Sequence, residues 1–268
     1  MNINFYKPQS SILKKYMLGY YIISKNENDK PFQYLTFPNN YCILSISLNA
    51  AVTLEPKKIT VRPSKKRNIS AGLVFRYINP IEIYYEKPVE EITIYFKPLG
   101  LHYFIDKPEH LFLQNNISEF DPFPDFKEKM YSIFATPKDE ARRNAFENYW
   151  LSKLKEKDLS FMEKLISDVA ADHKIGEIAK KHSISRQYLN RIFLTAIGKP
   201  PSEYRKIDRF RSSLANRNNI KNLTELSNEN LFYDQSHFIR NFKDLTSLSP
   251  HAFFKKVDVS KKNIWLFI

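Results

Sequence analysis

Four polar side chains lie close together in the C-terminal half of the chain and carry the donors and acceptors needed to read bases. They are Arg186, Gln187, Asn190 and Arg191. Leu189, Ile192 and Phe193 recur among them at helical spacing and should face inward, which leaves the polar set on the outer face. Arginine matches guanine edges, and asparagine or glutamine matches adenine edges, through paired hydrogen bonds. The pattern indicates base recognition in duplex DNA, although a solvated helix face explains any single one of these residues equally well.

The elements around this segment predict a helix-turn-helix. Ala179 is small where two helices must approach closely, and Ile178 and Ile184 supply apolar contacts between them. Ser183 occupies the turn, where many such motifs have glycine to reach a positive φ easily. Ser185 is a good N-cap for the next helix, since its hydroxyl can accept a backbone N–H. The sequence therefore predicts a second helix from Arg186 onward, with the polar set on its exposed side.

A second unit of the same kind follows about fifty residues later, from Leu226 to Lys243. Tyr233 or Asp234 should open its second helix, with Phe238, Phe242 and Leu245 facing the core. The side chains left for DNA or solvent are Gln235, Ser236, His237, Ile239, Arg240 and Lys243. Another helix should start at Pro250 after a Ser249 cap, because proline favours the first helical position. Two such units in one chain can contact two major grooves without dimerisation.

The residues of both units match a known pattern. In the second unit it is Phe232-x-Asp234-x-Ser236-x-Phe238-x-Arg240-x-Phe242-Lys243 followed by Ser249-Pro250, and in the first Leu189-x-Arg191-x-Phe193, Gly198-x-x-Pro201-x-x-Tyr204 and Arg209. In order and spacing this resembles the DNA-binding domain of the AraC/XylS family of bacterial transcription regulators, over roughly Leu159 to Lys256. The chain departs from the family at Ser227, Leu231, Ser247 and Phe254, where alanine, glycine, glycine and arginine are usual. These departures fall in the second unit, which we therefore expect to bind DNA less specifically.

One helix from Pro201 to about Asn216 should join the two units. At 1.5 Å per residue it would be about 24 Å long, enough to help set two recognition helices about one DNA turn apart. In the family that it resembles, the linker helix does this. Ile207, Phe210 and Leu214 form its packing stripe. The basic residues left free for phosphates or acidic partners are Arg205, Lys206, Arg209 and Arg211, and of these Arg205 and Arg209 are predicted DNA contacts.

The distribution of charged residues also favours DNA binding, although it is a less specific signal than the motifs. The chain has 42 Lys and Arg against 29 Asp and Glu, a net charge of +13. Between Lys180 and Lys221, eleven basic residues face only Glu203 and Asp208, a local balance of +9. Such a concentration is what phosphate contact requires. A second basic run, from Lys57 to Arg67, contains no acid; we expect a solvated hairpin there, with an auxiliary contact to DNA or to an effector phosphate as the alternative.

The N-terminal half has alternating apolar residues typical of short strands. The predicted strands are 41–48, 59–61, 71–75, 81–84 and 91–96, separated by breaks rich in proline and asparagine. Their number and spacing predict a small barrel or sandwich, and the resemblance implies a cupin-like β-barrel that binds an effector or dimerises. The fold class is thus α+β. We expect a barrel over residues 1–120, connecting helices over 121–157 and a DNA-binding domain over 158–268.

Two helices are predicted between these domains, from Phe126 to Phe134 and from Asp139 to Lys155. The second carries an apolar stripe of Phe146, Tyr149, Trp150 and Leu154. Core packing between domains is the favoured interpretation of the stripe, and dimerisation is the alternative. The apolar tail from Ile264 to Ile268 must also dock, either on the barrel or elsewhere.

Enzyme chemistry finds little support, and we expect no enzyme. There are five glycines and none cluster, so no phosphate-cradling loop is present. Cys42 is the single cysteine, which excludes a disulfide within the chain and a thiolate zinc site. His102 and His110 lack the paired spacing that metal-binding cupin enzymes use. We therefore expect no metal and no cofactor.

Double-stranded DNA is the expected partner, with RNA polymerase as another if the protein is an activator. A small-molecule effector and a homodimer are further expectations for the barrel. One alternative is a barrel that only dimerises or binds a protein partner, and a weaker one is a barrel with enzyme activity. A clogged barrel would favour dimerisation, and an open cavity with convergent polar groups would favour effector sensing. With no long apolar segment or signal peptide in the sequence, we expect a cytoplasmic protein that contacts no membrane.

Overall fold

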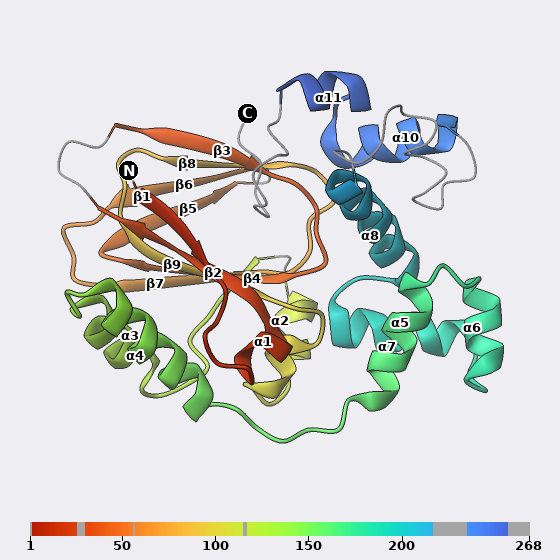
Figure 1. The fold of residues 1–268 in the computed structure, drawn as a ribbon, viewed down its shortest axis with the longest axis horizontal. Helices are drawn as coiled ribbons and strands as arrows, with labels where there is room; N and C mark the ends of the chain where they lie inside the picture. The colour runs from red at the N-terminus through yellow and green to blue at the C-terminus, as the bar shows by residue number, and fades with distance from the viewer. Residues whose placement is uncertain (1, 26–29, 56, 115–116, 217–234, 257–268) are drawn as a thin grey trace.

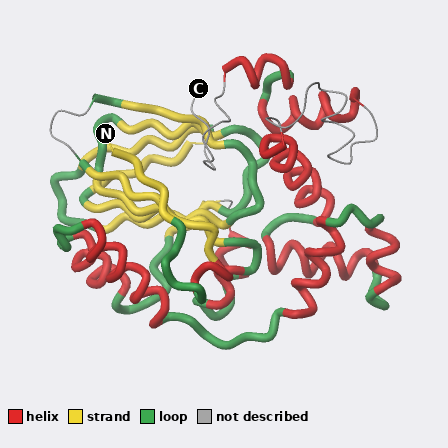
Figure 2. Tube along the Cα trace, in the orientation of Figure 1, coloured by secondary structure: helices red, strands yellow, loops and turns green. Residues whose placement is uncertain are grey.

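The computed structural model describes residues 2–25, 30–55, 57–114, 117–216 and 235–256. Within these ranges the chain is an α+β protein, with β-strands in the N-terminal half and helices in the C-terminal half (Figure 1). Figure 2 shows the same division, with the strands gathered in one body and the last helices beside it. No described helix has the length and the apolar character needed to cross a membrane.

The described strands form two sheets. The six-stranded sheet has the order β1-β2-β9-β4-β7-β10 and the four-stranded sheet the order β3-β8-β6-β5. Their bounds are β1 Asn2–Tyr6, β2 Met17–Ser24, β3 Phe32–Thr36, β4 Cys42–Leu48, β5 Ala50–Glu55, β6 Lys58–Pro63, β7 Ile69–Val74, β8 Ile81–Tyr85, β9 Glu90–Phe96 and β10 Ile117–Glu119. All pairs are antiparallel except β6 with β8. The five predicted strands are confirmed, and β1, β2, β3, β5 and β10 are additional.

Sequence reasoning missed β2 because both of its faces are buried, so its residues do not alternate between apolar and polar. Tyr20 and Ile22 face the helices, and Tyr21 and Ile23 face the other sheet. Strand β5 was missed for the opposite reason, because nearly all of it is exposed. It pairs with β6 as a hairpin, which confirms the solvated hairpin expected within the basic run from Lys57 to Arg67.

Helices cover the outer face of the six-stranded sheet. Helices α3 (Phe126–Phe134) and α4 (Asp139–Ser152) lie along it, and α1 (Leu13–Tyr16), the 3₁₀ helix η1 (Gly100–Tyr103) and α2 (Glu109–Gln114) lie near its end (Figure 1). Helix α4 ends at Ser152 rather than at Lys155, so Leu154 lies beyond it and is half-buried, whereas Phe146, Tyr149 and Trp150 are buried. Trp150 is fully covered, its ring centre 5.2 Å from that of Phe96 and 5.3 Å from that of Phe104. The stripe is therefore core packing, as favoured, but against the barrel rather than between domains. Because the stripe is covered, it offers no dimerisation surface.

The C-terminal half contains six described helices. They are α5 Ser160–Ala170, α6 Ile175–Lys181, α7 Arg186–Ile197, α8 Pro201–Asn216, α10 Gln235–Thr246 and α11 Pro250–Lys256. The linker helix has the predicted bounds, and α11 begins at Pro250 with Ser249 Oγ accepting the backbone N–H of Ala252 at 3.3 Å. Two apolar clusters hold these helices, one around α5–α7 and one around α8, α10 and α11. The apolar tail from Ile264 to Ile268 lies outside the described residues, and the two predicted domain boundaries stay predictions.

Candidate nucleic-acid interface and barrel cavity

The first helical unit, α5–α7, has a core of its own. Leu165, Ile178, Leu189 and Phe193 are at most 1% exposed and pack in one cluster. The turn between α6 and α7 adopts the predicted geometry, because Ser183 has a φ of 55° without being glycine. Ser185 caps α7 as predicted, its Oγ accepting the backbone N–H of Tyr188 at 3.0 Å. The N-terminus of α7 is therefore fixed relative to α6.

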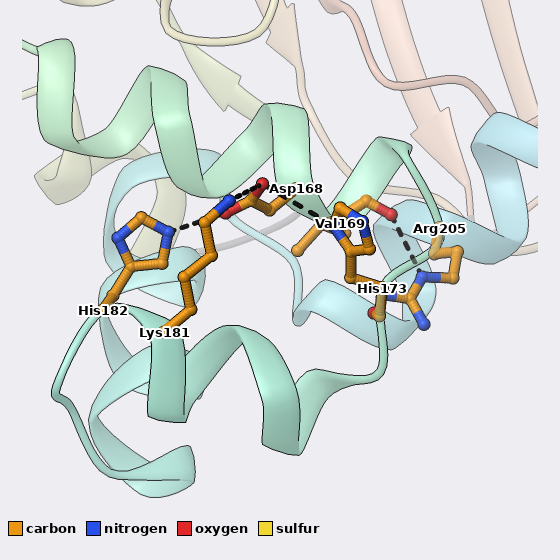
Figure 3. Close-up of polar contacts among 6 residues, drawn as sticks. All are labelled: Asp168, Val169, His173, Lys181, His182 and Arg205. Atoms are coloured by element: carbon orange, nitrogen blue, oxygen red, sulfur yellow. Dashed lines mark hydrogen bonds and ion pairs between the residues drawn. The ribbon is translucent and has the colours of Figure 1, made fainter.

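A buried carboxylate ties the helices of this unit together (Figure 3). Asp168 of α5 accepts hydrogen bonds from Lys181 Nζ and His182 Nε2, both at 2.7 Å. The hydrogen bond from Lys181, and then that from His182, lower the pKa of Asp168 below its ordinary value of 3.8. Asp168 thus joins the last turn of α5 to the C-terminal end of α6, next to the turn that leads into α7.

The four predicted reading residues on α7 are exposed. Arg186, Gln187, Asn190 and Arg191 all lie on its outer face, as the spacing implied. The Arg191 guanidinium lies over the ring of Tyr188 at 5.1 Å, and the Asn190 amide donates to the carbonyl of Arg186 at 3.1 Å. The guanidinium of Arg186 crosses α6 at Gly176, where an added Cβ would approach it to 2.9 Å. The four side chains form one polar surface at the N-terminal end of a capped helix, which we call the α7 face.

The basic residues of the linker helix α8 are engaged within the chain. Arg205 donates to the carbonyl of Val169 at 3.1 Å and to that of His173 (Figure 3), and its Nε lies 3.2 Å from Asp172. Arg209 also binds Asp172, and Lys206 binds Asp244 at 2.7 Å. Arg205, Lys206 and Arg209 therefore have acidic partners within the chain, and the prediction that they are left free was wrong.

Two further cations of the basic window are turned inward. Arg211 donates to the carbonyls of Phe37 and Pro38 in the barrel. Lys199 is 1% exposed and donates to the carbonyl of Asn39 at 2.9 Å, and burial lowers its pKa to about 8. The prediction that the basic residues between Lys180 and Lys221 contact DNA phosphates was therefore wrong for Arg211 and Lys199. A count of charges does not show which side chains point into the protein.

The second unit is described from Gln235 onward. Ser236, Arg240 and Lys243 are exposed on α10, and Phe238, Phe242 and Leu245 are buried as predicted. Ile239 is half-buried against the same cluster, so its assignment to DNA or solvent was wrong. The side chains of Gln235 and His237 lie outside the described part, as do the predicted first helix and turn and the predicted start at Tyr233 or Asp234. Ser247, where the family pattern has glycine, has a φ of 60°.

The core of the second unit includes a residue of the barrel. Phe37, from the loop between β3 and β4, is fully buried beside Phe210 and Phe253, its ring 5.0 Å from that of Phe253. Sequence reasoning treated this loop only as a break between strands. The sequence does hold one signal of this burial. Phe37 is a large aromatic residue beside the Pro38-Asn39-Asn40 turn, and a loop that is only solvated rarely carries such a residue.

Other contacts fix the first unit to the barrel. Arg76 forms a two-point ion pair with Glu203 at the start of α8, at 3.0 and 2.7 Å. His102 contacts the carbonyl of Ala196 at 2.7 Å. The chain leaves α7 at Gly198, whose φ of 76° suits glycine, and an added Cβ there would lie 2.7 Å from the ring of Phe75.

A cavity of about 200 Å³ lies between the two sheets of the barrel. Apolar residues of β5, β6 and β8 line one side, and the polar groups Ser45, Ser47, Ser70 and Glu91 lie on strands of the other sheet. Glu91 is 2% exposed. The barrel is therefore not filled by its aromatic residues, and of the two alternatives the open cavity with convergent polar groups is the one found. No cluster of His, Cys, Asp and Glu that could hold a metal occurs among the described residues.

Comparison with known proteins gives one family match. Residues 178–256 match the model of a helix-turn-helix domain. The match begins in α6 and ends with α11, so it includes α7, the linker helix α8 and the described part of the second unit, but not α5. No curated protein matches the chain.

Among solved structures, the chain is similar to ToxT from Vibrio cholerae. A fatty-acid-bound form is 13% identical, with a TM-score of 0.43, over 85% of this chain and 95% of that one. Another crystal form is also 13% identical, with a TM-score of 0.40, over 94% and 96% of the two chains. At these scores, conclusions about this chain rest on its own residues and on the matched domain.

Proposed function

We propose that this chain is a transcription regulator whose C-terminal region holds an AraC-type helix-turn-helix domain, and that it reads two successive major grooves of one DNA site. The first groove is read by Arg186, Gln187, Asn190 and Arg191 on the α7 face. The second is read by Gln235, Ser236, His237, Arg240 and Lys243 on α10. Arg205 and Arg209 on the linker helix stand beside these surfaces as phosphate contacts that keep their internal partners.

The α7 face carries the proposal. It is polar and exposed, and it lies at the N-terminal end of α7. That end is positioned by the Ser185 cap, by the turn at Ser183 and by the contacts of Asp168 between α5 and α6. Recognition helices contact bases with residues of their N-terminal turns. Linker helix α8, about 24 Å long at 16 residues, is long enough to help space two such helices about one turn of DNA apart.

The first test is selection of bound sequences from random duplex DNA by the full-length protein at two salt concentrations. A bipartite motif with half-elements about 10 bp apart supports reading of two grooves by one chain. Strongly salt-dependent binding without a motif would mean that the protein contacts DNA phosphates and does not read bases. Absence of binding at low salt would overturn the proposal.

Arginine variants then assign the half-elements. Arg191→Ala should weaken binding to the selected site by about 1–3 kcal/mol and relax the preference in one half. Arg240→Ala should do the same in the other half. Lys129→Ala, which removes an exposed charge from α3 on the far side of the barrel, is the control for net charge. Equal weakening by Arg191→Ala on every sequence would mark that residue as a phosphate contact.

We further propose that the barrel cavity binds a small-molecule effector. The cavity is supported by its volume and by the polar groups that converge on it. A ligand in the cavity can change the affinity for DNA only if the barrel and the DNA-binding domain have two relative arrangements and the ligand binds one of them more tightly than the other. The loop between β3 and β4 supplies a connection, because its Phe37 side chain lies in the core of the second unit. A homodimer, RNA polymerase as a partner and the division at residues 120 and 157 remain part of the proposal.

A further inference from the structure

The barrel cavity contains one fully buried carboxyl group, that of Glu91. Its Oε1 accepts hydrogen bonds from Thr93 Oγ1 at 2.8 Å, Tyr85 Oη at 2.9 Å and Tyr21 Oη at 3.2 Å. Its Oε2 accepts one, from Ser47 Oγ at 2.9 Å. A carboxylate has about four lone-pair sites, two on each oxygen. Oε1 is therefore saturated, and Oε2 has room for one more donor.

Every one of these donors is a neutral hydroxyl. Tyr34 Oη lies 3.1 Å from Tyr21 Oη and extends the network by one more hydroxyl. Burial raises the pKa of Glu91 above its ordinary value, and the hydrogen bonds from Thr93 and Ser47 oppose that rise. The network is arranged to hold a carboxylate, yet it supplies no positive charge to balance one.

The cavity walls do not supply that charge either. Among the described residues that line it there is no lysine, arginine or histidine. The other acidic residue among the described lining residues is Glu119 on β10, which is exposed. A buried carboxylate without a cation is costly and takes up a proton instead. A cationic ligand would stabilise the ionised form, which the four hydroxyl donors already favour.

We propose that the ligand of this cavity is a small primary amine with an apolar body, whose ammonium group binds Oε2 of Glu91. This inference rests on the proposed effector function of the cavity. An apolar cavity of about 150 Å³ accommodates benzene, so about 200 Å³ suits one ring or a short branched chain with an aminoethyl arm. Val61, Ile83 and Val74 supply apolar walls for that body.

Anionic ligands fit this cavity poorly. A fatty acid or another carboxylate would bring a third negative charge beside Glu91 and Glu119, and like charges at this range repel. A neutral alcohol could fill the volume and donate to Oε2, but it would leave the carboxylate without a counter-charge. The ordering expected from the site is therefore amine, then alcohol, then carboxylate.

Three probes of nearly the same shape test this ordering: phenethylamine, phenethyl alcohol and hydrocinnamate. Binding of each to the full-length protein is measured by titration calorimetry at neutral pH. We expect phenethylamine to bind at least tenfold more tightly than phenethyl alcohol, and hydrocinnamate not to bind. Equal or tighter binding of the alcohol or of hydrocinnamate overturns the amine proposal, and so does a failure of phenethylamine to bind.

Two variants locate the amine. Glu91→Gln keeps the shape and removes the charge, and should weaken phenethylamine at least tenfold while leaving phenethyl alcohol within about threefold. Glu119→Gln, at an exposed carboxylate of the same cavity, is the matched control and should change amine binding much less. The reverse pattern would overturn the role of Glu91.

Gly72→Leu is a third variant, and its effect does not depend on the hydrogen bonds of Glu91. Gly72 lines the cavity on β7, and an added Cβ there meets no atom within 4 Å. A leucine side chain should occupy the free volume and abolish amine binding while the barrel stays folded. Retained amine binding would place the ligand elsewhere and overturn the proposal.

These outcomes are separable from the proposed function. If the alcohol or hydrocinnamate binds better, and Gly72→Leu blocks it, the cavity remains an effector site and only the ligand class fails. If phenethylamine binds as expected but selection returns no DNA motif, the groove-reading function fails and the ligand class stands.

Discussion

The two helical units of the C-terminal region are completed in different ways. The first unit buries Leu165, Leu189 and Phe193 among its own helices, with Leu99 joining from the barrel at the edge. The second unit buries Phe37 of the barrel in the middle of its aromatic cluster. The first is bound to the barrel through polar contacts, through Leu99 and through the packing of Gly198 against Phe75, and the second has a barrel residue at the centre of its core.

This difference assigns the two units different roles. A unit with its own core presents the same reading surface whatever the barrel does. A unit whose core contains a barrel residue must respond when the loop that carries that residue moves. We therefore expect a change in the barrel to alter binding to the second half-element first, with the first half-element serving as a constant anchor.

Loss of Phe193 tests the independence of the first unit and should have the largest effect. Phe193→Ala removes a fully buried ring from its core and should lower the free energy of unfolding by about 3–5 kcal/mol. Urea unfolding measures this, and binding to the selected DNA should be lost. Phe161→Ala, at a phenylalanine that is 43% exposed in the same unit, is the control and should cost less than about 1 kcal/mol. Similar losses for both variants would mean that the first unit has no tight core.

Loss of Phe37 tests the dependence of the second unit. Phe37→Ala should lower the free energy of unfolding by roughly 3 kcal/mol, because the cavity that it leaves lies among Phe210, Phe242 and Phe253. Footprinting should show weaker protection of the second half-element and an unchanged first half-element. Equal weakening of both would show that the units are not separately tied to the barrel.

The Asp168 contacts sharpen the comparison further, since they occur only in the first unit. Asp168→Asn should reduce stability by about 1 kcal/mol at neutral pH, since Lys181 is largely exposed and water screens its share. The folded protein has the lower pKa for this carboxyl, so its stabilisation is present above pH 3.8 and is lost as the pH falls through the folded value. The difference between variant and wild type should therefore disappear in acid. Glu177→Gln, at an exposed carboxylate of α6, should show no such pH dependence.

The cap of α7 gives the smallest predicted effect. Ser185→Ala removes the acceptor for the backbone N–H of Tyr188 and should cost about 0.5 kcal/mol, the low end for loss of an N-cap, because the cap is exposed. DNA affinity at the first half-element should fall modestly, with the second unaffected. Ser167→Ala, at an exposed position within α5, is the matched control. An equal effect of the two variants would show that the cap does not hold the α7 face.

Much of this arrangement could be predicted from local patterns in the sequence. Ser183 at the turn, Ser185 at the cap and the bounds of α8 from Pro201 to Asn216 each follow from rules that act within a few residues. The buried and exposed sides of α7 follow from its period. These features need no knowledge of distant parts of the chain.

The features that could not be predicted depend on contacts between distant segments. Nothing near Phe37 indicates a partner more than 200 residues away at Phe253. Arg211 and Lys199 look like phosphate contacts until the barrel carbonyls that they bind are in place. Glu91 reads as the polar start of a strand, and its burial appears only when β3 and β8 close over it.

The insertion of Phe37 also bears on the order in which the protein is made. Domains emerge and fold from the N-terminus during synthesis, so the loop with Phe37 is in place before Phe210, Phe242 and Phe253 leave the ribosome. The barrel then acts as a template on which the last helices close. A gene fusion that moved only the C-terminal helices to another protein would therefore transfer one finished reading unit and one that lacks its central side chain.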